Sequence, residues 1–241
     1  MRLRKLAACF ATVVIATGAV AEVDSYAKRD DVGDYVDALV RDHAFSRDAL
    51  LELFAQTRRN ERVLELIARP AERRLEWHEY RGILVDEPRI DLGVQFWNDN
   101  ADTLARAESV YGVAAEYLVA IIGVETRYGK IKGSYPVLEA LTTLGFDYPP
   151  RSSFFKSELT QFLLLAREEQ QDPRSLNGSY AGAMGYGQFI PSSYRSYSVD
   201  FDGDGTRDIW NNRIDAIGSV ANYFSRHGWK GNADVVVLAA V

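Results

Sequence analysis

Residues 114–128 read AAEYLVAIIGVETRY, a run that predicts one strongly apolar helix. Leu118, Ile121 and Ile122 define an apolar stripe on this helix, and Glu125 lies on the same stripe, seven positions after Leu118. We expect a carboxyl group there to be desolvated, and desolvation raises the pKa of a carboxyl. An acid that keeps its proton near neutral pH suits general-acid cleavage of a glycosidic bond. The alternative is a structural carboxylate, paired with a backbone amide or with an arginine such as Arg127.

Apolar residues recur at helical spacing on both sides of this run. The sequence predicts short amphipathic helices between Asp30 and Asp86, with Ser46 and Asn60 as N-caps. Further helices are predicted over about 94–110, 155–166 and 214–226, and loops over 130–151, 177–191 and 200–211. Strand signals are nearly absent before Val235–Val237, so we expect a mainly α fold.

The first 21 residues have the pattern of a cleaved signal peptide. A basic start (Arg2, Arg4, Lys5) precedes an uncharged apolar run, and Ala19-Val20-Ala21 offers a cleavage site. That run is short for a membrane span, which needs about 20 residues. A retained anchor, or lipid attachment at Cys9, is the alternative. We expect an exported, periplasmic protein.

Composition excludes several classes of function. The 241 residues carry a net charge of −6, and removal of residues 1–21 takes away three positive charges and no negative ones, which leaves −9. An acidic chain lacks the basic surface of a nucleic-acid binder. Cys9 is the only cysteine, so the exported chain has no disulfide or cysteine metal site. The three histidines are widely separated and indicate neither a metal site nor a catalytic triad.

A glycine- and aromatic-rich stretch, GSYAGAMGYGQF, occupies residues 178–189. Its glycines let the backbone approach a ligand closely. Tyr180, Tyr186 and Phe189 offer flat faces for sugar rings, and Gln188 both donates and accepts hydrogen bonds. An ordinary loop is the alternative.

An acidic stretch, DFDGDGTRD, occupies residues 200–208. Asp200, Asp202 and Asp204 with a following glycine match the opening of an EF-hand calcium loop, in which Thr206 contributes its carbonyl. The bidentate glutamate of position 12 is replaced by Asn211. Asp215 lies in the first turn of the next predicted helix and is the candidate that completes the ligand shell. A structural calcium site is expected; a solvated acidic loop is the alternative.

Together these motifs resemble those of the soluble lytic transglycosylase B family. The resemblance runs over about 30–235 and rests on GVETRYG at 123–129, the 178–189 loop, the acidic loop, and DAIGSVANYF at 215–224. With the signal peptide predicted over 1–21, it implies an N-terminal helical domain (22–110) and a lysozyme-like helical core (111–241) that carries the EF-hand-like loop at 200–215. It also implies a lytic transglycosylase that cleaves the MurNAc–GlcNAc bond of peptidoglycan and leaves 1,6-anhydro-MurNAc ends during cell-wall turnover.

By motif match, the resemblance assigns a role to each candidate site residue. Glu125 aligns with the catalytic acid and base. The residues that align with the saccharide cleft are Ser179, Gln188 and Tyr223. Calcium-ligand positions match Asp200, Asp202, Asp204, Thr206 and Asp215, with one extra residue before Asp215 in this chain. We expect no organic cofactor, peptidoglycan glycan strands as the partner, and a monomer.

Three points stay open at this level. The family carries a Tyr-Asn motif after a small β domain, and we expect this sequence to stop before it, which puts the activity of the chain itself in doubt. A muramidase that hydrolyses the same bond needs a second carboxylate, for which Asp147 and Glu158 are candidates by chain proximity only. A protein that binds glycan or calcium without catalysis is the rival from another class.

Overall fold

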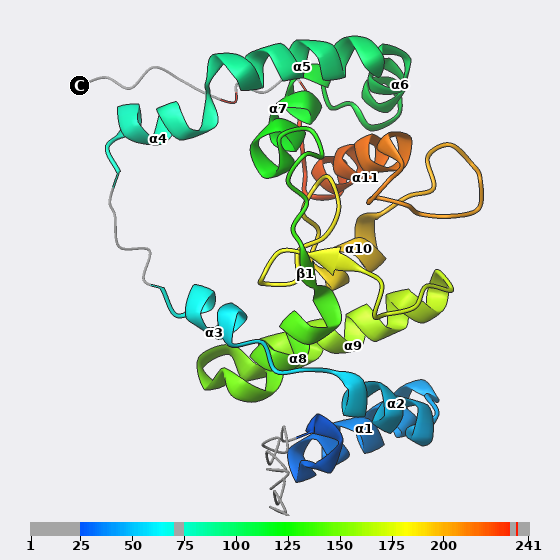
Figure 1. Ribbon diagram of the computed structural model, residues 1–241. Helices are drawn as coiled ribbons and strands as arrows, with labels where there is room; N and C mark the ends of the chain where they lie inside the picture. Colours follow the sequence, from blue (N-terminus) through cyan, green and yellow to red (C-terminus); the bar gives the residue numbers. More distant parts are fainter. Residues whose placement is uncertain (1–24, 70–74, 232–234, 236–241) are drawn as a thin grey trace, which may run out of the picture.

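Helices form almost all of the regular structure in the computed structural model, which describes residues 25–69, 75–231 and 235 (Figure 1). In chain order the elements are η1 (Tyr26–Lys28), α1 (Asp30–His43), α2 (Arg47–Gln56), α3 (Glu61–Ile67), α4 (Trp77–Leu84), α5 (Glu87–Asp99), α6 (Ala101–Tyr111), α7 (Ala115–Thr126), β1 (Tyr135–Pro136), α8 (Val137–Asp147), η2 (Pro149–Arg151), α9 (Ser152–Glu168), β2 (Asn177–Gly178), α10 (Pro191–Tyr197) and α11 (Arg213–Arg226). The predicted mainly α fold is confirmed. The predicted signal peptide, and the predicted strand from residue 236 on, lie outside the described residues.

Helix α8 shows that the prediction of a loop-rich stretch over 130–151 was wrong from Val137 on, although residues 131–134 do form a loop. All residues from Val137 to Phe146 except Glu139 are buried, and α8 packs along α9. A helix that is buried on nearly every side shows no amphipathic stripe. Pro136 and the Pro149-Pro150 pair, which suggested a loop, instead mark the two ends of this helix.

The helices before α7 lie at two ends of the molecule. Helices α1–α3 lie beside α8 and α9, whereas α5 and α6 lie beside α7 and α11 (Figure 1). Buried side chains from both groups belong to one connected hydrophobic cluster. The division at residue 110 stays a prediction, because the elements on either side of it share this core.

Local capping explains several helix ends. Ser46 and Asn60 accept hydrogen bonds from the amides of Ala49 (3.4 Å) and Val63 (3.2 Å), as predicted for N-caps. The single helix predicted over 94–110 was wrong, because the chain breaks at Asn100 between α5 and α6. The buried Asn100 side-chain amide donates to the Phe96 carbonyl (2.7 Å) and so competes with continued helix.

The two short strands join the segment after α7 to the segment after α9. β1 pairs antiparallel with β2, with Tyr135 opposite Gly178 and Pro136 opposite Asn177. This pairing holds the start of the glycine-rich loop beside the start of α8. Among the described residues no single helix is long and apolar enough to cross a membrane; α6 and α7 meet that test only as a pair bent by 113°.

A buried polar network fixes the N-terminal end of the described chain to α8. The Asp147 carboxylate, whose side chain is 12 % exposed, accepts from the Tyr26 hydroxyl (2.5 Å) and from the Arg29 guanidinium (2.6 Å). Burial, followed by the bond to Asp147, raises the pKa of Tyr26. Tyr26 and Arg29 precede α1, and Arg59, whose guanidinium lies 3.7 Å from the same carboxylate, precedes α3, so Asp147 anchors the first helices on the core.

Replacing Asp147 by Ala is expected to lower the free energy of unfolding by about 1–3 kcal/mol. The variant removes the short bond of the buried Tyr26 hydroxyl and leaves the Arg29 guanidinium with Asp31 as its remaining carboxylate partner. The control is Asp37→Ala, which removes an exposed ion pair with Arg47 and should cost less than about 0.5 kcal/mol. Urea denaturation followed by circular dichroism measures both. Equal losses in the two variants would contradict the anchoring role.

Candidate functional site

Helix α7 ends at the site, and its last turn divides buried from accessible residues. The buried stripe of α7 consists of Ala115, Leu118, Val119, Ile122, Gly123 and Thr126. Thr126 therefore continues the stripe, and the prediction that Glu125 does so is corrected. The Glu125 side chain lies one position off the stripe and is exposed, beside the half-buried Ile121.

Three successive residues after Glu125 and Thr126 have positive φ angles: Arg127 (49°), Tyr128 (60°) and Gly129 (85°). This conformation is unfavourable for residues with a side chain, so packing has to hold it. A Cβ atom at Gly129 would lie 2.1 Å from the Tyr186 ring. Glycine is thus required where the turn passes closest to the glycine-rich loop.

The Thr126 hydroxyl joins the end of α7 to that loop. It is 1 % exposed, donates toward the carbonyls of Ile122 (3.2 Å) and Tyr186 (3.0 Å), and accepts from the Gly129 amide (3.0 Å). The residue after Glu125 therefore fixes both the helix end and the position of residue 186.

The glycine-rich loop is held by its own backbone and by the segment after the acidic loop. Met184 and Phe189 exchange two backbone hydrogen bonds of 2.9 Å, and the Tyr186 amide donates to the Ile209 carbonyl (3.0 Å). Gly185 has a φ of 68°, and a Cβ atom there would lie 2.5 Å from the same carbonyl. The loop is therefore an ordered wall of the site.

A pocket of about 390 Å³ opens where α7, this loop, α10 and α11 meet. It is lined by Ile121, Glu125, Gly187, Gln188, Phe189, Ile190, Ser193, Val220, Tyr223 and Phe224. Glu125 is the one charged group among these described lining residues. The arrangement is a mainly apolar pocket with one acid and a few polar partners, which is typical of small-ligand sites.

Desolvation by the surrounding protein raises the pKa of Glu125 above its usual value. The side chain is nevertheless exposed, and it lines the pocket. The raised pKa and the exposure of the side chain are compatible, because the apolar pocket wall shields the carboxyl on one side and leaves it open to a ligand on the other. The direction of the shift favours a proton donor. The alternative of a pair with Arg127 is not seen, because the Arg127 guanidinium bonds to Asp86.

Gln188 and Tyr223, predicted to bind the saccharide, lie in this pocket with Glu125. Gln188 has a φ of 50°, and its side-chain amide donates to the carbonyls of Gly185 (3.0 Å) and Lys132 (3.2 Å). Among the described residues no group donates a hydrogen bond to its side-chain oxygen, which is therefore free to meet a ligand. Ser179 does not line the pocket. Its hydroxyl accepts from the amides of Ala181 (3.3 Å) and Ala183 (3.0 Å), which shapes the loop, and its binding role stays a prediction.

Aromatic contacts fix the orientation of Tyr223. Its ring stacks on His227 at a centroid distance of 4.0 Å and meets the Tyr197 ring edge-on at 5.2 Å. Phe189 lies 5.7 Å away on the pocket side. Such a fixed aromatic surface suits a sugar ring.

The sequence reasoning missed Ser193, which lies on the short helix α10. Pro191 at the first position of this helix was the available signal, because proline is favoured there. Glu158 explains how α10 is held: its buried carboxylate accepts from the Ser192 amide (2.9 Å). Glu158 and Asp147, the two candidates for a second catalytic carboxylate, both hold other elements in place and neither lines the pocket.

The acidic loop gathers three of its five predicted ligands. One carboxylate oxygen from each of Asp200, Asp202 and Asp204 lies within 4.8 Å of the others, a donor set that fits a hard cation. Hydrogen bonds from the backbone amides of Gly205, Gly203 and Asp204 hold the pKa of Asp200 below its usual value. The backbone amides therefore favour the charged form of the Asp200 carboxyl, as a cation ligand requires.

Asp215 lies outside this cluster. Its side chain is fully buried, and its two oxygens accept from the amides of Phe201 (2.7 Å) and Asp208 (2.9 Å), on opposite sides of the loop. Asp215 thus closes the loop from inside. The Thr206 amide donates to Asp204 (2.8 Å), and the ligand roles of Thr206 and Asp215 stay predictions.

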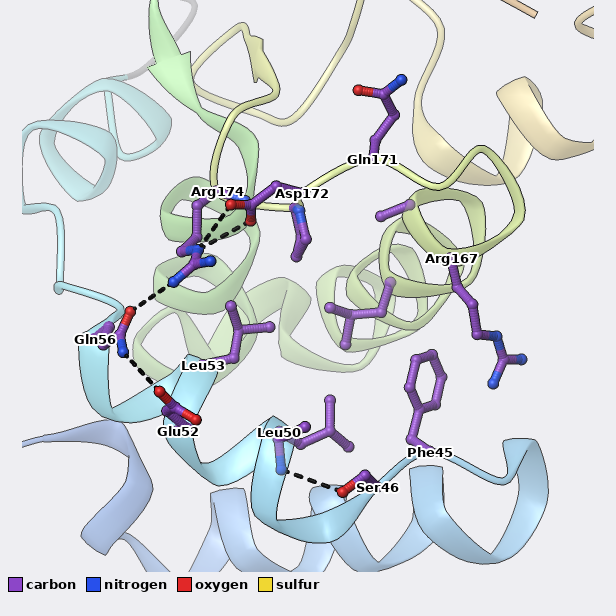
Figure 2. A pocket seen from close by; sticks show the side chains of 14 residues that line it. Phe45, Ser46, Leu50, Glu52, Leu53, Gln56, Arg167, Gln171, Asp172 and Arg174 are labelled. Atoms are coloured by element: carbon purple, nitrogen blue, oxygen red, sulfur yellow. Dashed lines mark hydrogen bonds and ion pairs between the residues drawn. The ribbon is translucent and has the colours of Figure 1, made fainter. Parts of the chain in front are cut away.

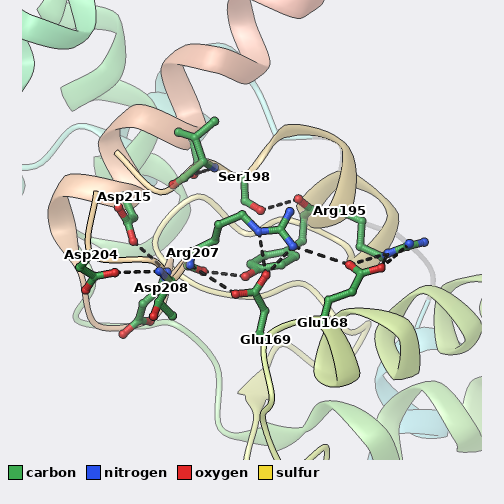
Figure 3. Close-up of polar contacts among 12 residues, drawn as sticks. Glu168, Glu169, Arg195, Ser198, Asp204, Arg207, Asp208 and Asp215 are labelled. Atoms are coloured by element: carbon green, nitrogen blue, oxygen red, sulfur yellow. Dashed lines mark hydrogen bonds and ion pairs between the residues drawn. The ribbon is translucent and has the colours of Figure 1, made fainter. Parts of the chain in front are cut away.

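An ion-pair network connects the acidic loop to the end of α9 (Figure 3). Arg207 leaves the loop and pairs with Glu169, while Arg195 of α10 pairs with Glu168 (2.6 Å). The Tyr194 hydroxyl donates to the Arg207 carbonyl (2.6 Å). The network fixes the acidic loop relative to α10, which carries one wall of the pocket.

A second pocket, of about 330 Å³, lies between α2 and the end of α9 (Figure 2). Its charged groups have partners already: Arg174 bonds to Asp172 (2.9 Å) and Gln56 (2.9 Å), and Arg167 donates to the His43 carbonyl (2.8 Å). None of the predicted site residues lines it. The Glu125 pocket is therefore the better candidate.

Comparison with known proteins shows one family throughout. The family description "Transglycosylase SLT domain" matches residues 28–241. The membrane-bound lytic murein transglycosylase B of Escherichia coli strain K12 is 46 % identical over 223 residues, which cover 89 % of this chain and 62 % of that protein. This chain therefore spans about three fifths of the length of that curated relative.

Two solved structures are similar over most of the chain. The soluble lytic transglycosylase SltB1 from Pseudomonas aeruginosa is 56 % identical with a TM-score of 0.84, covering 85 % of this chain and 69 % of that one. The Escherichia coli lytic transglycosylase Slt35 in complex with calcium is 48 % identical with a TM-score of 0.80, covering 84 % of this chain and 64 % of that one.

Replacing Thr126 by Val is expected to lower the free energy of unfolding by about 1–3 kcal/mol, because the buried Tyr186 carbonyl and Gly129 amide each lose the partner that the hydroxyl supplied. Thr126→Ser keeps the hydroxyl and is the matched control, with a smaller loss from the missing methyl group. Chemical denaturation measures both. A valine variant as stable as the serine variant would show that the hydroxyl does not hold the site together.

Proposed function

The chain belongs to the transglycosylase SLT domain family, and we propose that it is a lytic transglycosylase that cleaves peptidoglycan glycan strands, with Glu125 as its acid and base. One observation carries the proposal: a single carboxyl with a raised pKa faces a pocket lined otherwise by apolar, aromatic and neutral polar groups. We further propose the periplasm as the place of action, in keeping with the predicted signal peptide and with the murein substrate in the relative's name.

The first step is proton donation. Protonated Glu125 gives its proton to the oxygen that links N-acetylmuramic acid to N-acetylglucosamine, and the bond from that oxygen to C1 breaks. The N-acetyl oxygen of the same muramic acid residue bonds to C1 and takes up the developing positive charge. Such substrate assistance replaces the second carboxylate that most glycosidases need.

The second step closes a ring in the sugar. Glu125, now ionised, removes the proton from the C6 hydroxyl of the muramic acid residue. The C6 oxygen then attacks C1 and displaces the N-acetyl oxygen, which gives a 1,6-anhydro end and restores the protonated Glu125. No water is consumed, and the chain's own residues supply one proton carrier, an aromatic platform at Tyr223 and a polar contact at Gln188.

Hydrolysis of the same bond has less support. A muramidase requires a second carboxylate placed to activate water or to bond to C1. Among the described residues that line the pocket no second carboxylate is present. Asp147 and Glu158 are engaged in bonds that hold the N-terminal segment and α10.

Replacing Glu125 by Gln is expected to reduce the release of soluble fragments from purified peptidoglycan at least about a hundredfold, because the amide neither donates nor removes a proton in this way. Glu116→Gln, at the exposed first turn of the same helix, is the matched control and should keep full activity. Mass spectrometry of the fragments should show ends lighter by one water molecule than reducing ends. Reducing ends would identify a hydrolase, and binding without release by the unmodified chain would identify a glycan-binding protein.

We also propose that the acidic loop binds a structural calcium ion through Asp200, Asp202 and Asp204. The proximity of the three carboxylates supports this, as does the calcium complex of the similar Slt35 structure. The ion would neutralise mutual repulsion in a loop that contacts the pocket wall through Ile209 and Tyr186. Its role would be to hold the loop, at a distance from the proton transfer.

Calcium is expected to raise the melting temperature of the protein, since an ion that binds only the folded state stabilises it by about 2.7 kcal/mol at a hundredfold excess over its Kd. Asp204→Asn should lose most of this gain, whereas Asp102→Asn on α6 removes the same charge elsewhere and should keep it. Scanning calorimetry with chelator and with calcium measures the shift. An equal gain in both variants would rule out the proposed ligands.

A further inference from the structure

The arginine two positions after Glu125 directs its charge away from the pocket. Arg127 is the C-cap of α7, with a φ of 49°, and its guanidinium donates to the Asp86 carboxylate. Both side chains are partly buried, with 34 % of Arg127 and 28 % of Asp86 exposed. A cation within about 4–6 Å of a carboxyl lowers its pKa by about 1–3. The position of the Arg127 guanidinium therefore affects whether Glu125 can keep its proton.

Asp86 uses its two oxygens for two different partners. One oxygen accepts from the Arg89 amide (2.7 Å) as the N-cap of α5, and the other receives the Arg127 guanidinium. Its capping function needs only an acceptor, whereas holding Arg127 needs the negative charge as well. The two functions can therefore be separated by a single substitution to Asn.

Packing of Tyr128 fixes the direction in which the turn sends Arg127. The Tyr128 ring lies 5.3 Å from the Phe96 ring of α5. A Cβ atom at Gly93 or Gly123 would lie 2.5 Å or 2.4 Å from the Tyr128 hydroxyl, so the tyrosine fits between α5 and α7 only because both residues are glycines. Arg127 directly precedes Tyr128 in the chain, so this contact helps to set where the Arg127 side chain begins.

We propose that Asp86 is a positioning residue for the reaction: it holds the Arg127 guanidinium against the start of α5 and so prevents it from pairing with the Glu125 carboxyl. This inference rests on the proposed acid–base role of Glu125 and assigns the residue that protects it. Asp86 acts through Arg127 and does not itself line the pocket.

Several other charged groups on the elements beside Glu125 have partners of their own. On the α5 side Arg89 donates to the Leu84 carbonyl (2.6 Å), and after the α7 turn Lys132 donates to the Trp210 carbonyl. On α10 Arg195 pairs with Glu168, and on α11 His227 stacks on Tyr223. Lys130 and Arg226 on the flanking segments are exposed, and neither lines the pocket. Among the described residues Arg127 is the cation nearest in sequence to Glu125, and Asp86 is the carboxylate that holds it.

The test compares the titration of Glu125 in four proteins: the unmodified chain, Asp86→Asn, Arg127→Met and the double variant. The carboxyl carbon of ¹³C-labelled glutamate reports the pKa by NMR, and the Glu125 signal is identified by its absence in Glu125→Gln. Asp86→Asn should lower the pKa of Glu125 by about half a pH unit or more, because the freed guanidinium stabilises the ionised form. The double variant should restore the original value or exceed it.

The NMR titration tests this inference independently of the proposed reaction, because it needs no turnover. Where fragments are released, the alkaline limb of the pH–rate profile should move to lower pH in Asp86→Asn, since the protonated acid starts the reaction, and should return in the double variant. An unchanged or raised pKa in Asp86→Asn overturns the proposal. So does an equal fall in Asp86→Asn and the double variant, which would mean a structural effect that does not pass through Arg127. Thermal melts confirm that all four proteins are folded.

Discussion

The constraint on which the site depends is the end of helix α7, where the chain must turn immediately after Glu125. Three consecutive positive φ angles are compatible with Arg127, Tyr128 and Gly129 only because neighbouring groups hold each one. Thr126 bonds across to the Tyr186 carbonyl, and Tyr128 fits between two glycines. The same turn therefore orients the acid, attaches the glycine-rich loop and sends the adjacent cation toward α5.

The acidic loop at 200–208 also supports the pocket, although it lies some distance along the chain. The segment that follows the three clustered aspartates supplies the Ile209 carbonyl to the Tyr186 amide, while Arg207 connects the loop to α9. Asp215 closes the loop through two backbone amides and lies on the helix that carries Tyr223. A cation at the aspartates would stiffen a support of the pocket wall without taking part in proton transfer.

Much of the fold follows from local patterns in the sequence. Apolar spacing and caps predicted most of the helices, and Ser46 and Asn60 cap as expected. Helix α8 was not predicted because burial on nearly all sides removes the amphipathic signal, and α10 was not predicted because it is short. At the site, Glu125, Gln188 and Tyr223, which the motifs singled out, line one pocket, whereas Ser179 does not, and the roles predicted for these residues stay predictions. Sequence spacing did not predict that Arg127 would bond to Asp86, or that Asp215 would turn inward, because both depend on contacts between distant segments.

The most direct measurement is a crystal structure of the Glu125→Gln variant with a bound glycan fragment of alternating N-acetylglucosamine and N-acetylmuramic acid. The glycosidic oxygen on the muramic acid C1 should lie about 2.6–3.2 Å from the residue 125 side chain, as proton transfer requires. Tyr223 and Gln188 should contact the sugars on either side of that bond. A glycan bound along another groove, or bound here with its glycosidic oxygen facing away from residue 125, would contradict the assignment of Glu125 as the acid.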